Sequence, residues 1–216
     1  MKKNRSRQRC KFRQALQPLM LVSLCLCQFS SKATHLFNDP DERFIKLDAH
    51  GVPVGDPQAS WDCILDLKTE LIWEVKGTEG LRYRGNTYTW YNPHLPQNGG
   101  AAGFRNGGHC RGSRCDTHSY IDTLNRLGLC GLHTWRLPLR EELRSLVDYQ
   151  LHPPETAINS GYFPNTMPQF YWSATPDAND SESAWGIGFT FGYDYSYFKS
   201  DLGYVRAVTK VHKTGD

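Results

Sequence analysis

The chain has 216 residues and a formal net charge of +3, from 25 lysines and arginines against 22 aspartates and glutamates. Eight of these basic residues and none of the acids lie in residues 1–33, so the basic excess gives no reason to expect a nucleic-acid-binding protein. The remaining residues, about 183, carry a net charge of −5. They contain no internal repeat and are enough for one domain with its own core.

The N-terminus predicts export. Seven basic residues within 1–13 precede an apolar run over 18–29, and Ser31 and Ala33 place small side chains where a cleavage after Ala33 needs them. We therefore expect residues 1–33 to be a signal peptide and the mature protein to be secreted, periplasmic or on the cell surface. An uncleaved membrane anchor is the alternative, but a span needs about 20 apolar residues, which is longer than this run.

Four cysteines follow the signal peptide, and an even number in an exported chain indicates two disulfides. Cys110 and Cys115 close a short loop that contains Gly112, which favours their pairing and leaves Cys63 to pair with Cys130. The second bridge closes a long loop and is expected to stabilise the fold by roughly 4 kcal/mol. A zinc site is the alternative, but the spacing lacks a C-x2-C pair.

The first half of the mature chain predicts strands and a long loop. Residues 34–59 are polar and rich in Pro and Gly, so we expect an irregular N-terminal lead-in. Apolar, partly alternating runs at 61–67 and 71–75 flank three polar residues, which predicts a β-hairpin. Residues 83–91 are rich in aromatic side chains and predict an extended segment. Residues 92–114 contain six glycines, which indicates a long surface loop of the kind that carries function.

Two helices are predicted in the middle of the chain. Asp116 or Thr117 can cap a helix over 117–127, and Gly128 ends it. A second helix is expected over 140–149, because apolar residues recur there at spacings of three and four. The apolar faces contain Tyr120, Ile121, Leu124 and Leu127 in the first helix, and Leu143, Leu146 and Val147 in the second.

Between the helices, Trp135-Arg136-Leu137-Pro138 predicts an extended corner, because the residue before a proline avoids the α region. Arg136 lies among apolar residues, and a mostly buried guanidinium needs a fixed anionic partner. Glu142, in the first turn of the second helix, supplies it. We therefore interpret Trp135, Arg136, Pro138 and Glu142 as a structural corner. A catalytic pair is the alternative, but nothing nearby supplies a nucleophile.

The last third of the chain completes the fold with short runs of β-forming residues at 171–174, 184–191 and 203–208. Strands, then two helices, then strands predict an α+β fold with antiparallel strands. We expect these elements to form a single domain over residues 60–212.

The polar turn at 177–183 resembles a calcium loop through its acidic and amide side chains. An EF-hand needs Gly at its sixth position and Glu at its twelfth, and the chain has Glu182 and Gly188 there. We therefore expect no metal and no cofactor. A looser, lectin-type calcium site is the alternative.

A cluster of arginines is the feature that suggests a ligand. Five arginines and no acid lie between residues 80 and 115, together with several aromatic side chains. Guanidinium groups suit sulfate and carboxylate, and aromatic faces suit sugar rings. An ordinary solvated loop is the alternative. The expected ligand-binding residues are Arg82, Arg84, Trp90, Arg105, Arg111 and Arg114.

An ordered set of short blocks runs through the chain. They are Trp61-Asp62-Cys63, Leu71-Ile72-Trp73-Glu74-Val75, Cys115-Asp116-Thr117, Leu129-Cys130-Gly131, Trp135-Arg136-Leu137-Pro138 with Glu142-Leu143, Tyr162-Phe163-Pro164-Asn165-Thr166, Tyr171-Trp172-Ser173, Ala184-Trp185 and Val205-Arg206. Together they resemble the Lcl C-terminal domain family over about residues 60–210. The resemblance implies a C-type-lectin-like fold, and the best-understood member of the family looks like an adhesin module that binds sulfated polysaccharides.

The chain departs from the family at Leu139, where the family usually has a small hydroxyl residue. Leucine has no side-chain oxygen to cap a helix, so we expect the second helix to begin less favourably, by roughly 1 kcal/mol.

The Arg-Leu-Pro-x-x-x-Glu core also resembles the corner of sulfatase-modifying-factor proteins, which makes an enzyme with an unrecognised site one alternative. Those enzymes work with a cysteine pair late in the domain, and no cysteine follows Cys130 here. Serine-hydrolase and phosphate-loop signatures are also absent from the sequence. We therefore expect a non-enzymatic binding or adhesion module without catalytic residues. Its expected partner is an anionic glycan or an envelope protein, and a structural envelope component is the remaining alternative.

Overall fold

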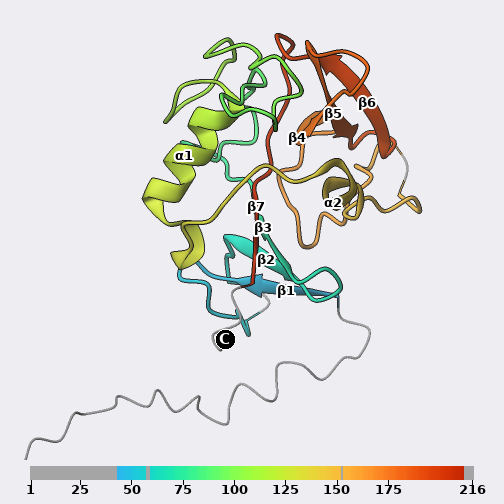
Figure 1. Ribbon diagram of the computed structural model, residues 1–216. Helices are drawn as coiled ribbons and strands as arrows, with labels where there is room; N and C mark the ends of the chain where they lie inside the picture. Colours follow the sequence, from blue (N-terminus) through green and yellow to red (C-terminus); the bar gives the residue numbers. More distant parts are fainter. Residues whose placement is uncertain (1–42, 57–58, 152, 212–216) are drawn as a thin grey trace, which may run out of the picture. The chain divides into compact units, whose positions relative to one another are not determined.

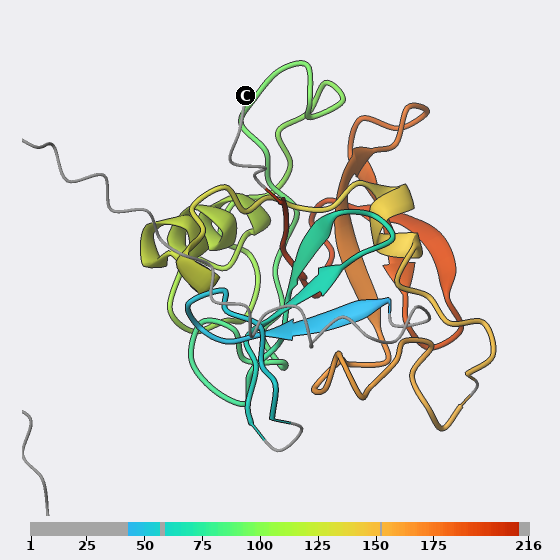
Figure 2. The same ribbon diagram turned by 90° about the horizontal axis from the view of Figure 1, so that it is seen from below.

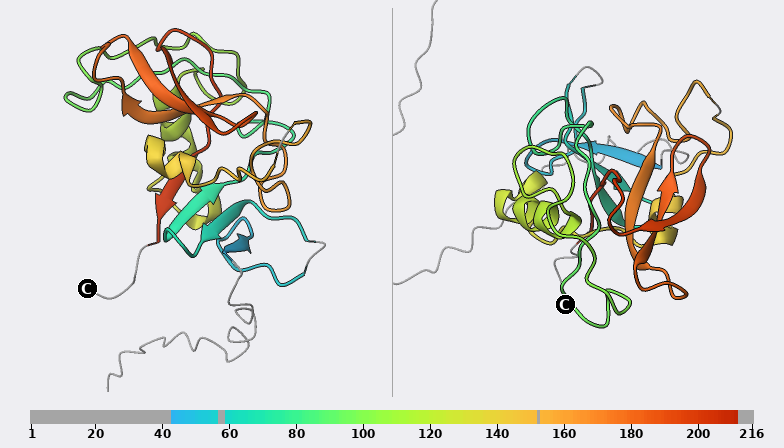
Figure 3. Two further views of the ribbon diagram at one scale, coloured as in Figure 1. Left: turned by 90° about the vertical axis from the view of Figure 1, so that its right-hand side faces the viewer. Right: turned by 90° about the horizontal axis from the view of Figure 1, so that it is seen from above.

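The computed structural model describes residues 43–56, 59–151 and 153–211 (Figure 1). The predicted signal peptide and its cleavage site lie outside the described residues. Within them the domain has two α-helices and two antiparallel sheets, which confirms the α+β prediction. Figures 1 and 3 show the two sheets toward opposite ends of the domain, with the last described segment running from one to the other.

The first sheet has the strand order β1-β2-β3-β7. β2 and β3 form the predicted hairpin, with Cys63 opposite Glu74. β1 lies at the edge of this sheet (Figure 2) and corrects the expectation of an irregular lead-in over 34–59. Its end residues, Phe44 and Leu47, are buried, but four residues among Pro and Gly carry too little periodicity to reveal a strand. The strands are β1 (Phe44–Leu47), β2 (Cys63–Asp66), β3 (Leu71–Glu74) and β7 (Val208–Lys210).

The second sheet has the order β4-β5-β6, also antiparallel. The strand predicted at 184–191 ends earlier, because the chain turns at Gly192, whose φ is +77°. The turn leads into β6, which was not predicted because its tyrosines alternate with polar residues without a buried face. The strands are β4 (Phe170–Pro176), β5 (Ser183–Gly188) and β6 (Tyr193–Phe198).

Helix α1 (Thr117–Leu127) is present as predicted. The Asp116 carboxylate accepts a hydrogen bond from the Ser119 amide at 2.8 Å, and Gly128 ends the helix in the left-handed conformation, with φ +69°. A single turn of 3₁₀ helix, η2 (Leu129–Gly131), follows it. Burial of Tyr120 and Leu124 confirms part of the predicted apolar face, whereas Leu127 is exposed.

Helix α2 (Arg140–Arg144) is shorter than the predicted helix over 140–149. Leu143 and Leu146 are buried as predicted. Leu146 lies in the turn that follows Arg144, so its burial does not require a longer helix. After Arg144, the Leu146 and Val147 amides donate to carbonyls three residues earlier, and the Asp148 amide donates to the Ala157 carbonyl at 3.0 Å. The chain therefore leaves the α-helical hydrogen-bond pattern before residue 149, where the apolar spacing predicted the helix to end.

The start of α2 is bonded partly by a side chain of its own first turn and partly by β4. Leu139 supplies no side-chain acceptor, as expected, but its amide donates to the Glu142 carboxylate at 2.8 Å. The Arg140 amide donates to the Thr175 hydroxyl of β4 at 3.1 Å. These two acceptors satisfy the amides of Leu139 and Arg140, which are different donors from those that an N-cap side chain would bond.

Both predicted disulfides are present. Cys63–Cys130 joins β2 to η2, and Cys110–Cys115 closes the loop directly before α1. The long-range bridge lies in the core, since both of its cysteines are buried. It links the first sheet to the end of α1, and the short bridge stiffens the arginine-rich region.

Candidate functional site

Residues 80–115, which contain the five arginines and precede α1 in the chain, form a framework of extended segments that we call the arginine-rich framework. Residues 87–91 lie at its centre and form isolated bridges to 103–109 and to Asp116. Asp116, which caps α1, also accepts a hydrogen bond from the Asn106 amide at 3.1 Å. The Cys110–Cys115 bridge closes the remaining turn. The loop predicted from its glycines therefore has a defined backbone from which its side chains project.

Four of the five predicted arginines are exposed on this framework, namely Arg84, Arg105, Arg111 and Arg114. The Arg105 guanidinium lies 5.8 Å from the centre of the Tyr91 ring, and the Arg111 guanidinium 5.9 Å from the centre of the Tyr83 ring. Within the described part of the chain, none of the four arginines forms an ion pair. Their charges face solvent, and two of them rest against aromatic rings.

Arg82 and Trp90 are less exposed than the other four predicted ligand-binding residues. Arg82 pairs with the Asp62 carboxylate and donates to the Val75 carbonyl at 2.8 Å, so its guanidinium joins the loop to the first sheet. Trp90 is fully buried, and its indole N–H donates to the Ser173 carbonyl at 2.9 Å. The sequence showed which residue types were present, but not which side chains point inward.

A pocket of about 450 Å³ opens beside the framework. Its lining is mostly apolar and comes from the arginine-rich loop, α1, the Trp-Arg-Leu-Pro corner and β4. Tyr91 lines the pocket, and the Arg105 guanidinium lies 5.8 Å from the centre of the Tyr91 ring. A positive charge therefore lies close to the pocket. Apolar surface with a few placed polar groups is the usual chemistry of a ligand pocket. The lining residues are Trp90, Tyr91, Asn92, Gln97, Thr117, His118, Ile121, Arg136, Leu137, Leu139 and Ala174.

The Arg136–Glu142 pair has the bidentate geometry expected of a structural corner. The two terminal nitrogens of the Arg136 guanidinium, Nη1 and Nη2, each donate to one oxygen of the Glu142 carboxylate at 2.7 Å. Burial acts to raise the pKa of Glu142, but the hydrogen bonds from Arg136 and from the Leu139 amide outweigh it, so this pKa is lowered. The expectation of a mostly buried guanidinium is wrong, because the Arg136 side chain is 38% exposed and lines the pocket. Trp135 and Pro138 are buried, which anchors the corner in the core.

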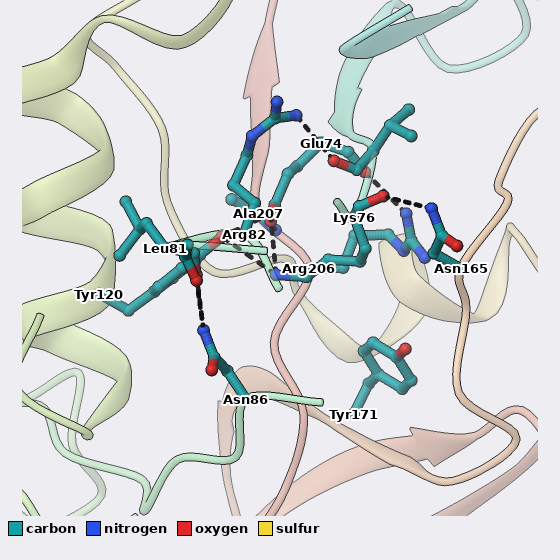
Figure 4. A network of polar contacts seen from close by, with 12 residues as sticks. Glu74, Lys76, Leu81, Arg82, Asn86, Tyr120, Asn165, Tyr171, Arg206 and Ala207 are labelled. Carbon is teal, nitrogen blue, oxygen red and sulfur yellow. Dashed lines mark hydrogen bonds and ion pairs between the residues drawn. The ribbon is translucent and has the colours of Figure 1, made fainter. Parts of the chain in front are cut away.

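A buried ionic network, not predicted from the sequence, lies between the first sheet and α1 (Figure 4). One Glu74 oxygen accepts from the Lys76 ammonium at 2.8 Å and from the Tyr120 hydroxyl at 2.5 Å. The other oxygen accepts from the Ala207 amide at 2.9 Å, and the Arg206 guanidinium donates to the Glu74 carbonyl at 2.7 Å. The signal was present in the sequence, since Glu74 and Arg206 are charged residues inside apolar runs.

Burial and ion pairing act on the pKa values of this network in opposite directions. Burial acts to raise the pKa of Glu74, but the Lys76 charge and the three hydrogen bonds outweigh it and lower this pKa. Burial lowers the pKa of the Lys76 ammonium, against the opposing effect of Glu74. The two side chains are 0% and 3% exposed, so they contact protein rather than a ligand. We assign the network a structural role.

The turn at 177–183 uses its carboxylates within the protein. Asp177 accepts from the Ser196 hydroxyl at 2.7 Å, and Asp180 accepts from the Ser183 hydroxyl at 2.7 Å. The Lys199 ammonium is buried next to this turn and donates to the main-chain carbonyls of Asn98, Ala101 and Ser181. No group of three or more His, Cys, Asp or Glu side chains suited to a metal ion occurs in the residues that the structure describes.

The geometry defines a disulfide-linked α+β domain with a pocket beside a stiff, arginine-rich loop. A family model, the Lcl C-terminal domain, matches residues 62–209, and the chain therefore belongs to the Lcl C-terminal domain family. This confirms the membership that the sequence blocks suggested. No curated protein and no solved structure matches the chain.

Two features bear on the compartment. The pair of disulfides indicates an oxidising environment, in which such bonds form and persist. Among residues 43–56, 59–151 and 153–211, no helix is long and apolar enough to cross a bilayer.

Proposed function

We propose that this protein is an exported, non-enzymatic binding module for an anionic polysaccharide at the cell envelope or outside the cell. Its binding surface is the arginine-rich framework together with the pocket of about 450 Å³ beside it. The observation that carries the proposal is the position of Arg105, whose guanidinium rests on the Tyr91 ring at the pocket wall.

The residue types at this surface suit a charged sugar. A guanidinium donates paired hydrogen bonds to sulfate or carboxylate oxygens, and an apolar or aromatic wall contacts the C–H faces of the sugar ring. Arg111 and Arg114 lie within the turn that the Cys110–Cys115 bridge closes, and they extend the basic surface beyond the pocket. Because the disulfide and the backbone bridges hold the loop, little conformational freedom is lost when a ligand binds.

The charge of the whole domain opposes long-range attraction of a polyanion. After removal of residues 1–33 the net charge is −5, so the arginines act only at short range. Binding should therefore weaken as salt rises, because these exposed charges are screened.

Calorimetry with a sulfated oligosaccharide and its desulfated form, each at two salt concentrations, tests this function. The triple variant Arg105→Ala, Arg111→Ala and Arg114→Ala should bind the sulfated form at least tenfold more weakly, a loss of about 1.4 kcal/mol or more. A matched control removes the same charge from other exposed sites, with Lys68→Ala, Arg126→Ala and Lys210→Ala.

Each result has a defined meaning. Loss of binding in the arginine triple variant but not in the control triple variant supports the assigned surface. Equal loss of binding in both variants would mean that binding depends on the net charge of the domain and not on the assigned surface. Wild-type protein that binds neither oligosaccharide would overturn the proposed function. Mass spectrometry of the mature N-terminus tests export separately, with cleavage after Ala33 as the expected result.

A further inference from the structure

The second sheet carries a strip of exposed aromatic side chains. In β6, tyrosines alternate with polar residues, so Tyr193, Tyr195 and Tyr197 lie on one face of the strand. They are 60%, 37% and 40% exposed, and Phe191, which precedes the strand, is 52% exposed. β6 is an edge strand of the sheet that the structure describes, and Figures 1 and 3 show it at the outside of the domain.

The rings are held in place by each other and by the sheet below. Tyr195 and Tyr197 stack with centroids 5.9 Å apart and planes at 27°, and Phe170 of β4 contacts Tyr197 at 4.5 Å. Tyr195 lies over Gly188 of β5, where an added Cβ would come within 2.9 Å of the ring. The missing side chain at Gly188 therefore lets the Tyr195 ring settle onto the sheet.

The strip borders a hollow of about 250 Å³ whose lining contains no Asp, Glu, Lys, Arg or His. Aromatic side chains form most of its walls, and Gln169 and Thr190 add an amide and a hydroxyl. This lining suits an uncharged sugar, because aromatic faces contact C–H groups while neutral polar groups pair with sugar hydroxyls. It contrasts with the arginine-rich framework, whose charge suits an anionic ligand.

The size of the strip argues against a protein partner. With roughly 200 Å² for each aromatic side chain, the exposed fractions of the four rings leave an area on the order of 400 Å². A stable protein interface needs about 800 Å² on each partner. The strand rises about 13 Å from Tyr193 to Tyr197, so the strip is long enough for a chain of sugars but narrow.

We propose that Phe191, Tyr193, Tyr195 and Tyr197 form a second binding site that takes an uncharged pyranose chain. This site is independent of the arginine-rich framework and of the function proposed for it. The test titrates the complete mature protein with two uncharged oligosaccharides, chitohexaose and cellohexaose, and follows tyrosine and tryptophan fluorescence and NMR shifts.

Three variants address the geometry of the strip. The double variant Tyr195→Ala and Tyr197→Ala should weaken binding at least tenfold, whereas phenylalanine at both positions should keep most of it, because the ring faces remain. Gly188→Ala should also weaken binding, because it displaces the Tyr195 ring without removing it. Phe104→Ala, which removes a ring that is 55% exposed on the arginine-rich framework, should bind the uncharged sugars like the wild type. Circular dichroism checks that each variant folds.

The outcomes separate this site from the first. Uncharged-sugar binding that is lost in the tyrosine variant and kept in the arginine triple variant supports the strip. Wild-type protein that binds neither oligosaccharide would overturn it, whatever the result with sulfated sugars. If the tyrosine variant instead abolished self-association, seen by analytical ultracentrifugation, and sugar binding were absent, the strip would be an interface between two copies of the chain.

Discussion

Replacing Glu74 by glutamine should destabilise the domain by about 3–5 kcal/mol, because it breaks a buried ion pair. The carboxylate is fully buried and accepts from Lys76 and Tyr120 on one oxygen and from the Ala207 amide on the other. Glutamine has nearly the same shape but only one acceptor oxygen and an NH₂ donor. In either orientation it therefore presents a donor to at least one donor of the site and leaves the Lys76 charge without a counterion.

The same reasoning predicts a change of sign at Lys76. In the wild type, Lys76→Met should destabilise the domain, because it leaves the Glu74 carboxylate buried without its ammonium. In the Glu74→Gln background, the same change should stabilise the domain, because it removes an unpaired buried charge. Urea unfolding followed by tryptophan fluorescence measures the free energy of all four proteins of this double-mutant cycle.

Glu141→Gln is the matched control for this cycle. Glu141 pairs with Arg140 at 3.1 Å, but its side chain is 64% exposed, so its loss should cost less than about 1 kcal/mol. The reasoning would be refuted if Glu74→Gln cost no more than Glu141→Gln. It would also be refuted if Lys76→Met destabilised both backgrounds by the same amount.

Three further predictions follow from the other contacts. Arg136→Ala should cost about 1–3 kcal/mol in thermal unfolding, less than for a fully buried pair because the guanidinium is 38% exposed, and an unchanged melting temperature would contradict the corner assignment. Removing the Cys63–Cys130 bridge by replacing both residues with serine should cost about 4 kcal/mol, since it opens a loop between residues 67 apart in sequence, and non-reducing peptide mapping of the wild type checks the pairing itself. Folding lowers the pKa of Glu74 below its usual value of 4.5, so the stability difference between wild type and Glu74→Gln should be largest above pH 4.5 and should shrink as the pH falls below it. Urea unfolding midpoints that show a larger difference in acid would disprove the direction of this pKa shift.

Local signals in the sequence predicted the elements that their own residues specify. Asp116 and Gly128 placed the ends of α1, because a cap and a left-handed glycine act within one turn of the helix. The short loop between Cys110 and Cys115 predicted their disulfide for the same reason. The arginine-rich loop was also found from local composition, and four of its five arginines are exposed as expected.

The sequence did not predict features that depend on contacts between residues far apart in the chain. The Asp148 amide bonds to the distant Ala157 carbonyl instead of continuing α2, and the first amide of α2 bonds to Thr175 of β4. Burial of Trp90 likewise depends on packing against β4, through its bond to Ser173.

By itself the sequence determined the α+β class, both disulfide pairings, the helix α1, the Arg136–Glu142 corner and the family. Each depends on residues close together in the chain, on cysteine counting or on recognisable blocks. Only the tertiary structure decided the ion pair of Glu74 with Lys76, the aromatic strip on β6 and the pocket shared by Tyr91 and Arg136. These features form where separate segments meet, and the direction in which a side chain points is fixed by packing that no single segment encodes.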